Sequence, residues 1–211
     1  MPTFDSVIFD LDGTLWDASA AITLAFQRAK ASVDYVENDV TLAQVRAVTG
    51  QPYEVAHEQL FPGIPVARLA EFRALCAHQE LAAARQPGGI IYPAADATLR
   101  YLRGRDYRLF IVSNCQLGYV EAFFDNSQLG HYFEGHQCFG TKRLPKAENI
   151  REIVARYDLR APVYVGDTPG DQTASQAVGV PFIFATYGFG RIEAAAAPLR
   201  IDQLADLRRL L

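Results

Sequence analysis

Residues 6–9 are the first run of mostly apolar positions in the chain, and two acids and a glycine follow it directly. A short strand that is apolar on both faces is typical of a parallel sheet that helices cover on both sides. Ligands of such sheets bind beyond the carboxyl ends of the strands, which is where Asp10 and Asp12 lie. The pattern therefore predicts a buried strand that presents two carboxylates to a crevice.

Between residues 18 and 86 the apolar positions recur at helical spacing, and turn residues separate the segments. Asp17 or Ser19 can cap the first helix, and Gly50 ends the second. A break at residues 86–89, rich in proline and glycine, closes the block. The predicted helices cover residues 20–29, 42–48, 53–60 and 66 to about 85. The pattern predicts a small all-helical lobe inserted after the first strand.

Beyond the break, helices alternate with short apolar strands, which is typical of a doubly wound sheet. Strands are predicted at residues 108–112, 163–165 and 181–185, and helices at residues 94–103, 117–124, 146–157 and 171–178. The predicted fold is α/β, with a doubly wound parallel-sheet (Rossmann-like) core of residues 1–17 and 87–211 and an inserted helical lobe of residues 18–86.

Two further features concern the connections. Hinges between the two parts are expected near residues 15–19 and 86–90, where the chain passes from one part to the other. The alanine-rich residues 194–197, which end at a proline, are expected to belong to a surface helix.

Composition and charge narrow the function classes. The 211 residues are 50% hydrophobic, enough for a real core, and 24 acids against 20 bases give a formal net charge of −4. The charges are mixed along the chain, so no broad cationic surface for nucleic acid is expected. No signal peptide precedes the first strand, whose apolar run is too short to span a bilayer. We expect a cytoplasmic protein without membrane partners, in which Cys76, Cys115 and Cys138 are free thiols.

Polar residues follow two further predicted strands. Ser113 and Asn114 offer a hydroxyl, an amide and backbone N–H groups that can hold an anion, although Ser-Asn is also ordinary turn chemistry. Asp167 follows a strand and a glycine, and Asp171 stands where a helix begins. Either acid alone could be a loop residue or a helix cap. Carboxylates clustered with Asp10 would raise one another's pKa unless a cation such as Mg²⁺ neutralised them.

A lysine stands at the start of a predicted helix. Lys146 there opposes the helix dipole, which favours a nearby anion. Lys142 and Arg143 are close alternatives, since most lysines are simply solvated.

Four ordered segments together resemble the motifs of the haloacid-dehalogenase-like hydrolase superfamily. They are Asp10-Leu11-Asp12-Gly13-Thr14-Leu15, Ser113-Asn114, Lys146, and Gly166-Asp167-Thr168-Pro169-Gly170-Asp171. The helical block falls where the phosphoglycolate-phosphatase-like branch carries its α-helical cap. The third motif departs from the Lys-Pro of many relatives, because Ala147 follows Lys146, and the choice between Lys146 and Lys142 stays open.

The resemblance implies a role for each motif. Asp10 would be the nucleophile that forms an aspartyl-phosphate, and Asp12 the general acid and later the base. Magnesium would be held by Asp10, Asp167 and the backbone carbonyl of Asp12, with Asp171 positioning its waters. The phosphoryl oxygens would be bound by Ser113, the N–H of Asn114 and Lys146.

The resemblance implies a magnesium-dependent phosphatase that hydrolyses small phosphomonoesters. Asp12 favours phosphoryl transfer over dehalogenation, because a halide leaves without a proton. A phosphomutase of the β-phosphoglucomutase type remains an alternative, although residues 49–52, at the position of the substrate-facing cap loop, look more phosphatase-like. A receiver-like phosphoacceptor signalling domain is an alternative of another class, but receivers are shorter and lack the helical insertion. The substrate and the oligomeric state stay open.

Overall fold

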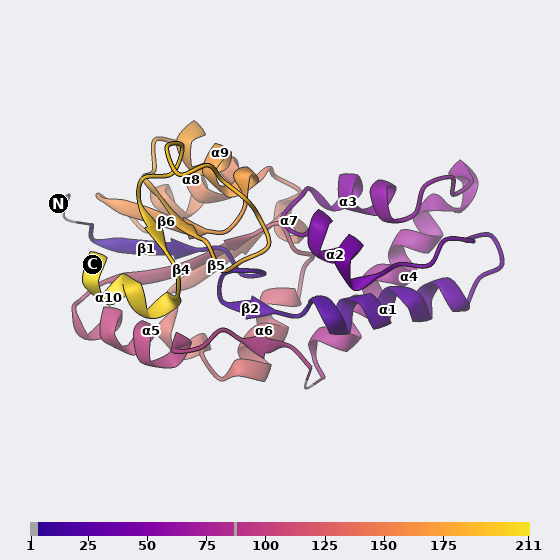
Figure 1. Ribbon diagram of the computed structural model, residues 1–211, viewed down its shortest axis with the longest axis horizontal. Coiled ribbons are helices and arrows are strands. Elements are labelled where there is room, and N and C mark those ends of the chain that lie inside the picture. Colours follow the sequence, from indigo (N-terminus) through magenta and orange to yellow (C-terminus); the bar gives the residue numbers. More distant parts are fainter. Residues whose placement is uncertain (1–3, 87) are drawn as a thin grey trace.

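A six-stranded parallel sheet in the order β5-β4-β1-β6-β7-β8 forms the core of the computed structural model (Figure 1). The structure describes residues 4–86 and 88–211. Residues 1–3 and 87, which the predicted core includes, lie outside this part. The strand order reverses beside β1, so a crevice lies beyond the carboxyl ends of the strands there.

The central strand β1 (Ser6–Phe9) pairs with β4 (Arg108–Ser113) on one side and β6 (Pro162–Gly166) on the other. Phe9 lies opposite both Ile111 and Val165, so the three strands end almost level. Residues that follow these strands therefore meet at one edge of the sheet. The predicted strands 6–9, 108–112 and 163–165 are confirmed.

The outer strands are β5 (Gly135–Cys138), β7 (Phe182–Ala185) and β8 (Arg200–Ile201). The sequence predicted β7 within residues 181–185 but neither β5 nor β8. Both lie at the ends of the sheet, and β5 carries the polar residues His136 and Gln137, so its apolar signal is weak.

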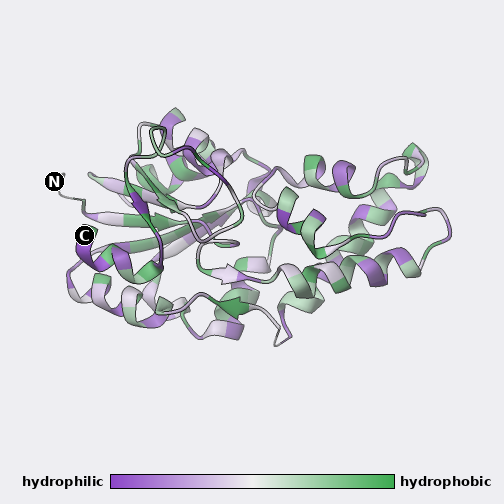
Figure 2. Ribbon diagram, in the orientation of Figure 1, coloured by the Kyte–Doolittle hydropathy of each residue, from purple (hydrophilic) through white to green (hydrophobic). Residues whose placement is uncertain are grey.

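Helices cover both faces of the sheet, because successive residues of each strand point to opposite sides. One face packs on α5 (Ala95–Gly104), α6 (Tyr119–Ser127) and α10 (Leu207–Leu210), and the other packs on α8 (Lys146–Arg156) and α9 (Pro169–Ala177). Figure 2 shows the strands as predominantly hydrophobic between these layers. The predicted Rossmann-like α/β fold is confirmed. Short helices α7 (Phe139–Lys142), η1 (Gly130–Tyr132) and η2 (Leu204–Asp206) complete the core.

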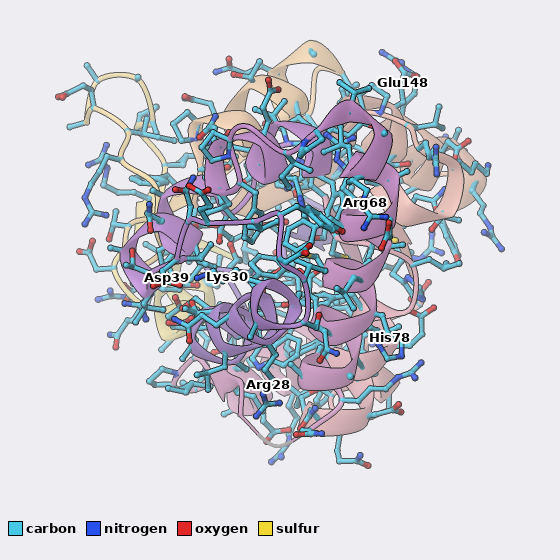
Figure 3. The ribbon with its side chains drawn as sticks, turned by 90° about the vertical axis from the view of Figure 1, so that its right-hand side faces the viewer. Arg28, Lys30, Asp39, Arg68, His78 and Glu148 are labelled. Carbon is cyan, nitrogen blue, oxygen red and sulfur yellow. The ribbon has the colours of Figure 1, made fainter. Side chains whose placement is uncertain are left out.

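The four described helices that follow β2 (Trp16–Asp17) and precede β3 (Ile90–Ile91) in the chain lie beyond the end of the sheet (Figure 1). They are α1 (Ser19–Ala31), α2 (Leu42–Val48), α3 (Tyr53–Leu60) and α4 (Val66–Ala84), close to the predicted spans. Helices α1 and α4 pack along each other. The carboxylate of Asp17 accepts a hydrogen bond of 3.0 Å from the N–H of Ser19 at the start of α1. Viewed from this end, charged side chains such as Lys30 and Asp39, an ion pair at 2.7 Å, cover the helices (Figure 3).

The chain enters and leaves the helical block through an unpredicted pair of short antiparallel strands, β2 (Trp16–Asp17) and β3 (Ile90–Ile91). Trp16 is buried, and its ring lies 5.5 Å from that of Tyr119. Of the helices in the described part of the chain, none is long and apolar enough to cross a membrane.

The surface helix expected at residues 194–197 is wrong, since these residues form a turn and irregular chain. Pro198 disfavours helical backbone at the residue before it, and Ala197 is buried against the face that α8 and α9 cover.

Candidate active site

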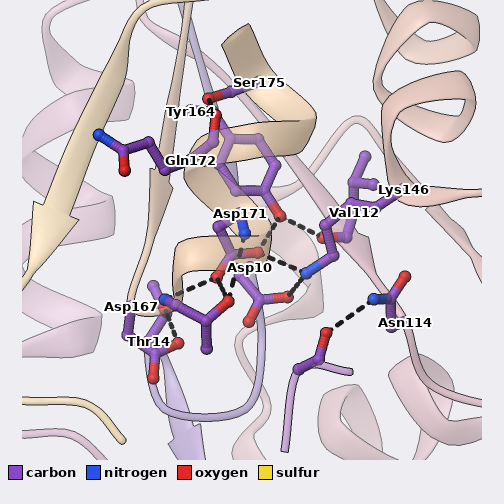
Figure 4. A network of polar contacts seen from close by, with 12 residues as sticks. Asp10, Thr14, Val112, Asn114, Lys146, Tyr164, Asp167, Asp171, Gln172 and Ser175 are labelled. Carbon is purple, nitrogen blue, oxygen red and sulfur yellow. Dashed lines mark hydrogen bonds and ion pairs between the residues drawn. The ribbon is translucent and has the colours of Figure 1, made fainter. Parts of the chain in front are cut away.

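Three carboxylates from separate elements meet at the sheet edge. Asp10 follows β1, Asp167 follows β6, and Asp171 lies in the first turn of α9. One oxygen of each lies within 4.8 Å of the others, and all three residues are buried (Figure 4). The level strand ends bring together acids that are far apart in the sequence, as expected.

A single lysine penetrates this acidic cluster. Lys146 is the first residue of α8, and its Nζ lies 2.8 Å from Oδ1 of Asp10 and 2.5 Å from Oδ1 of Asp171 (Figure 4). Its side chain is only 4% exposed. Lys142, the alternative, is 54% exposed and pairs with Glu152 at 2.7 Å. Of the two lysines, the structure places Lys146 among the acids.

The cluster carries more negative than positive charge. Burial, followed by the neighbouring Asp171, raises the pKa of Asp10 to about 6, although Lys146 opposes the shift. Burial, Asp171 and Asp10 raise the pKa of Asp167 to about 8. Since three acids face one lysine, the cluster could hold a further cation. Closely spaced carboxylate oxygens are the donors that Mg²⁺ takes, so the residues present fit this ion.

Asp167 is fixed by groups that the sequence did not reveal. Its Oδ1 accepts a hydrogen bond of 3.2 Å from the hydroxyl of Thr14, and its Oδ2 accepts one of 2.7 Å from the N–H of Phe189. Gly13 has a φ of +85°, and a Cβ there would lie 2.2 Å from Oδ2 of Asp167. The turn after β1 therefore requires glycine, and the loop after β7 closes over the site.

Asp171 serves both as a helix cap and as a member of the cluster. Its Oδ2 accepts hydrogen bonds from the N–H (2.9 Å) and the hydroxyl (2.7 Å) of Thr168, which caps α9. Its Oδ1 contacts Lys146. The hydroxyl of Tyr164 lies 3.4 Å from the same oxygen and donates to the carbonyl of Val112 at 2.7 Å. Asp171 is thus the N3 residue of the capping box, with Thr168 as the cap, and its role at a metal stays a prediction.

Asp12 lies beside this cluster with a partner of its own. Its Oδ1 accepts a hydrogen bond of 2.9 Å from the hydroxyl of Tyr119 on α6. Burial, followed by the charge of Asp10, raises the pKa of Asp12 well above its ordinary value. A raised pKa favours the protonated carboxyl group, which is the form that can donate a proton in a reaction.

The end of β4 joins the sheet to the helical block. Ser113 is buried, and Nδ2 of Asn114 donates a hydrogen bond of 2.8 Å to the carbonyl of Gly50, in the loop between α2 and α3 (Figure 4). Nε2 of Gln116 donates to the carbonyl of Ala77 (2.9 Å) and to Oε2 of Glu80 (2.6 Å) on α4. These contacts enclose a cavity of about 90 Å³ between the sheet edge and the helices.

The structure brings all predicted site residues to this edge of the sheet. Sequence reasoning missed the residues that hold or face them: Thr14, Glu80, Gln116, Tyr119, Tyr164 and Phe189. The loop of Phe189 does carry a signal in the sequence, glycines that follow a strand, which suits a loop at the cleft rim and an ordinary turn equally. A tyrosine or glutamate inside a helix gives no local signal.

Comparison with known proteins agrees with this geometry. The sequence model of a family described as haloacid dehalogenase-like hydrolase matches residues 7–185. The phosphoglycolate phosphatase of Pseudomonas putida is 30% identical over 97% of this chain and 78% of that protein. The probable phosphatase IndB of Dickeya dadantii is 27% identical over 95% of this chain and 90% of that protein.

Solved structures share the fold. A predicted phosphoglycolate phosphatase from Haemophilus somnus superposes with a TM-score of 0.87 at 20% identity, over 100% of this chain and 99% of that one. CbbY from Rhodobacter sphaeroides, solved in complex with phosphate, superposes with a TM-score of 0.80 at 18% identity, over 97% of this chain and 96% of that one. The fold match thus includes both the sheet and the inserted helices.

Proposed function

Because this chain belongs to the haloacid dehalogenase-like hydrolase family and is a phosphatase, we propose that it hydrolyses small phosphomonoesters with magnesium, through a phosphorylated Asp10. One observation carries the proposal: Asp10 lies at the sheet edge against Lys146, inside an acidic cluster, with a second acid only two residues away. A nucleophile, a cation and a proton donor therefore converge on one point.

The reaction runs in two balanced steps. An oxygen of Asp10 attacks the phosphorus, the bond from phosphorus to the ester oxygen breaks, and Asp12 gives that oxygen its proton. Asp12 then takes a proton from a water molecule that attacks the phosphorus. The bond to Asp10 breaks, inorganic phosphate leaves, and both carboxyl groups return to their starting state.

Three groups at the strand ends bind the phosphoryl oxygens in this proposal. The hydroxyl of Ser113 and the N–H of Asn114 supply hydrogen bonds, and Nζ of Lys146 supplies positive charge. The positions of these residues support this role, since Ser113 ends β4 and Lys146 begins α8 at the same edge as Asp10. Donors fixed before the reaction stabilise charge that builds on the phosphoryl group without having to reorganise.

Asp10, Asp167 and the backbone carbonyl of Asp12 would hold Mg²⁺, and Asp171 would position its waters. When bound, the ion supplies positive charge that offsets the charge of the phosphoryl group. The excess of buried carboxylates over cations in the cluster supports this assignment. The hydrogen bonds from Thr14 and Phe189 hold the Asp167 carboxylate in place.

We also propose the division of the chain into a catalytic core, residues 1–17 and 87–211, and an α-helical cap, residues 18–86. The cap excludes bulk water while the phosphorylated Asp10 forms. The substrate is a small phosphate ester, in keeping with the relatives named as phosphoglycolate phosphatases. A cytoplasmic location agrees with cysteines that are all free thiols within the described residues.

Release of inorganic phosphate from a panel of small esters, with and without Mg²⁺, tests the function. We expect magnesium-dependent release by the wild type and none by Asp10→Asn. Borohydride trapping followed by peptide mass spectrometry should place the acyl-phosphate on Asp10. Release retained by Asp10→Asn would reject Asp10 as nucleophile, and no release from any ester would favour the phosphomutase, tested next with β-glucose 1-phosphate and its bisphosphate activator.

A further inference from the structure

The cavity between the cap and the sheet edge has the position of a leaving-group site. Its floor includes Asp10, Asp12 and Ser113, and its roof comes from α1, α2, α3 and α4. A phosphoryl group attacked by Asp10 lies at this floor, so the group attached to it extends into the cavity. The cavity has a volume of about 90 Å³, which suits a leaving group of a few non-hydrogen atoms.

The chemistry of the walls is mostly apolar with a few polar groups, all of them acidic or neutral. Apolar side chains from the cap cover much of the surface: Ile22, Phe26, Val45, Val48 and Leu60. Among the described residues that line the cavity there is no lysine or arginine. An anionic leaving group would therefore find no countercharge beyond the phosphate site.

Polar side chains of the cap also line this cavity, among them His57 and Glu80, beside Thr49, Gln51 and Tyr53. His57 on α3 is 2% exposed, and neither of its ring nitrogens has a hydrogen-bond partner among the described residues. Its ring packs between aromatic neighbours, with centroids 5.8 Å from Phe26 and 5.3 Å from Phe61. Burial, followed by the charge of Arg73, lowers the pKa of His57 to about 4, so the imidazole is neutral. It offers one donor and one acceptor.

Glu80 on α4 is another polar group of the cap at this wall. Its Oε2 accepts the hydrogen bond of 2.6 Å from Gln116, whose amide is also held by the carbonyl of Ala77. Burial raises the pKa of Glu80 to about 7. Whether ionised or protonated, its carboxyl can accept a hydrogen bond from a ligand.

The basic side chains near the site line a neighbouring groove and not this cavity. Arg46, Arg143 and Lys146 line a larger groove of about 740 Å³, which adjoins the cavity and shares Thr49, Gly50, Gln51 and Asn114 with it. Neither Asp10 nor Asp12 lines that groove. Among the described residues, the arginines therefore line the adjoining groove and not the cavity that Asp10 and Asp12 line.

We propose that this site selects phosphomonoesters whose leaving group is short, carries no negative charge, and ends in a hydrogen-bond donor that Glu80 and His57 bind. The donor is a hydroxyl or an ammonium group. This inference rests on the proposed phosphatase function and deepens it. Under this proposal the preferred substrate is not phosphoglycolate, the carboxylate-bearing ester in the names of the relatives.

Four esters of nearly equal size test the selectivity: 2-aminoethyl phosphate, 2-hydroxyethyl phosphate, propyl phosphate and phosphoglycolate. We expect kcat/KM for the better of the two donor-bearing esters to exceed that for propyl phosphate roughly tenfold, and that for phosphoglycolate by more. The ratio between the two donor-bearing esters distinguishes an ammonium from a hydroxyl substrate.

Glu80→Gln keeps the size of the side chain and removes its charge. We expect it to lower kcat/KM for the preferred ester about tenfold and to raise that for phosphoglycolate. Glu71→Gln is the matched control, because Glu71 is an exposed acid on the same helix. His57→Phe, which suits the aromatic surroundings, should bring the ratio between 2-hydroxyethyl and propyl phosphate close to one.

The outcomes separate the two proposals. Phosphoglycolate as the best of the four esters, with a preference that Glu80→Gln leaves unchanged, would overturn the selectivity and leave the phosphatase function standing. Calorimetry of the same esters binding to Asp10→Asn should give the same ranking. A ranking of affinities led by phosphoglycolate would also overturn the proposed selectivity. Release from none of the four esters by the wild type with Mg²⁺ would overturn both proposals.

Discussion

The hydroxyl of Tyr119 donates a hydrogen bond of 2.9 Å to Oδ1 of Asp12, across 107 positions of the sequence. Tyr119 is 1% exposed and belongs to α6, a helix of the core layer. The side chain of Asp12 is therefore oriented by a buried residue of a helix that packs on the sheet. In the proposed reaction this fixes the proton donor before substrate binds.

Tyr119→Phe removes that hydrogen bond while keeping the aromatic ring that packs on Trp16. We expect kcat to fall about tenfold, with KM little changed, because the misplaced proton matters in the transition state more than in the ground state. Phosphate release at saturating ester measures this. Tyr107→Phe, which loses a bond to the carbonyl of Leu211, is the control. A raised KM with unchanged kcat would contradict the role.

Removing the positive charge of Lys146 should destabilise the protein when no metal is present. Lys146→Met leaves buried acids without their cation, and breaking a buried ion pair in this way costs about 3–5 kcal/mol. Burial alone would lower the pKa of Lys146, but Asp10 and Asp171 raise it well above its ordinary value, so the lysine is charged. Urea unfolding should show the loss, and Mg²⁺ should restore part of it.

Lys142→Met is the control for this measurement, because Lys142 forms a half-exposed pair with Glu152. Exposed pairs of this kind contribute about 0–1 kcal/mol. If Lys146→Met were no less stable than Lys142→Met, the acidic cluster would not depend on the lysine.

The raised pKa values of Asp10 and Asp167 predict how stability changes with pH. Folded Asp167 holds its proton up to a pH of about 8, and Asp10 up to about 6, whereas unfolded aspartates release it near about 4. Folding therefore takes up protons in this window, and the free energy of unfolding of the metal-free protein should fall as pH rises from about 4 to about 8. Thermal unfolding at several pH values measures this decline.

Magnesium should counteract the decline, since it competes with protons for the same carboxylates. The rise in Tm on adding Mg²⁺ should be larger at pH 8 than at pH 6. Asp167→Asn should remove most of this rise, whereas Asp39→Asn, at an exposed position of the cap, should retain it. A rise in Tm that is equal at both pH values would argue against metal binding by the cluster.

Local patterns were sufficient to predict the central strands, the four inserted helices and the conjunction of acids at strand ends. Each of these features is encoded within a few residues: an apolar run before Asp10, or helical spacing between residues 66 and 84. The doubly wound type of sheet was also predictable, although not its strand order, because parallel strands joined by helices have few alternative topologies.

What the sequence could not show depends on contacts between distant segments. The pairing of β2 with β3 joins residues more than seventy positions apart, and the polar strand β5 is recognisable only beside β4. Tyr119, the partner of Asp12, lies in a helix whose pattern gives no sign of this contact, and the glycines beside Phe189 mark a loop but not its bond to Asp167. The turn at residues 194–197 follows from burial of Ala197, which tertiary packing decides.

The hydrogen bond from Asn114 to the carbonyl of Gly50 predicts that closure of the cap contributes to the apparent affinity for the ester. Asn114→Ala keeps the backbone N–H proposed to bind phosphate but removes the 2.8 Å bond that ties the sheet to the α2–α3 loop. The closed state should become less populated, so the ester must supply more of the closure energy and the apparent affinity falls. We expect KM to rise several-fold with kcat changed less.

The control variant is Asn126→Ala, which loses a bond to the carbonyl of Ala84 at the end of α4, away from the cavity. It should lower the Tm without raising KM. Equal KM values for the two variants would mean that the Asn114 side chain does not control closure.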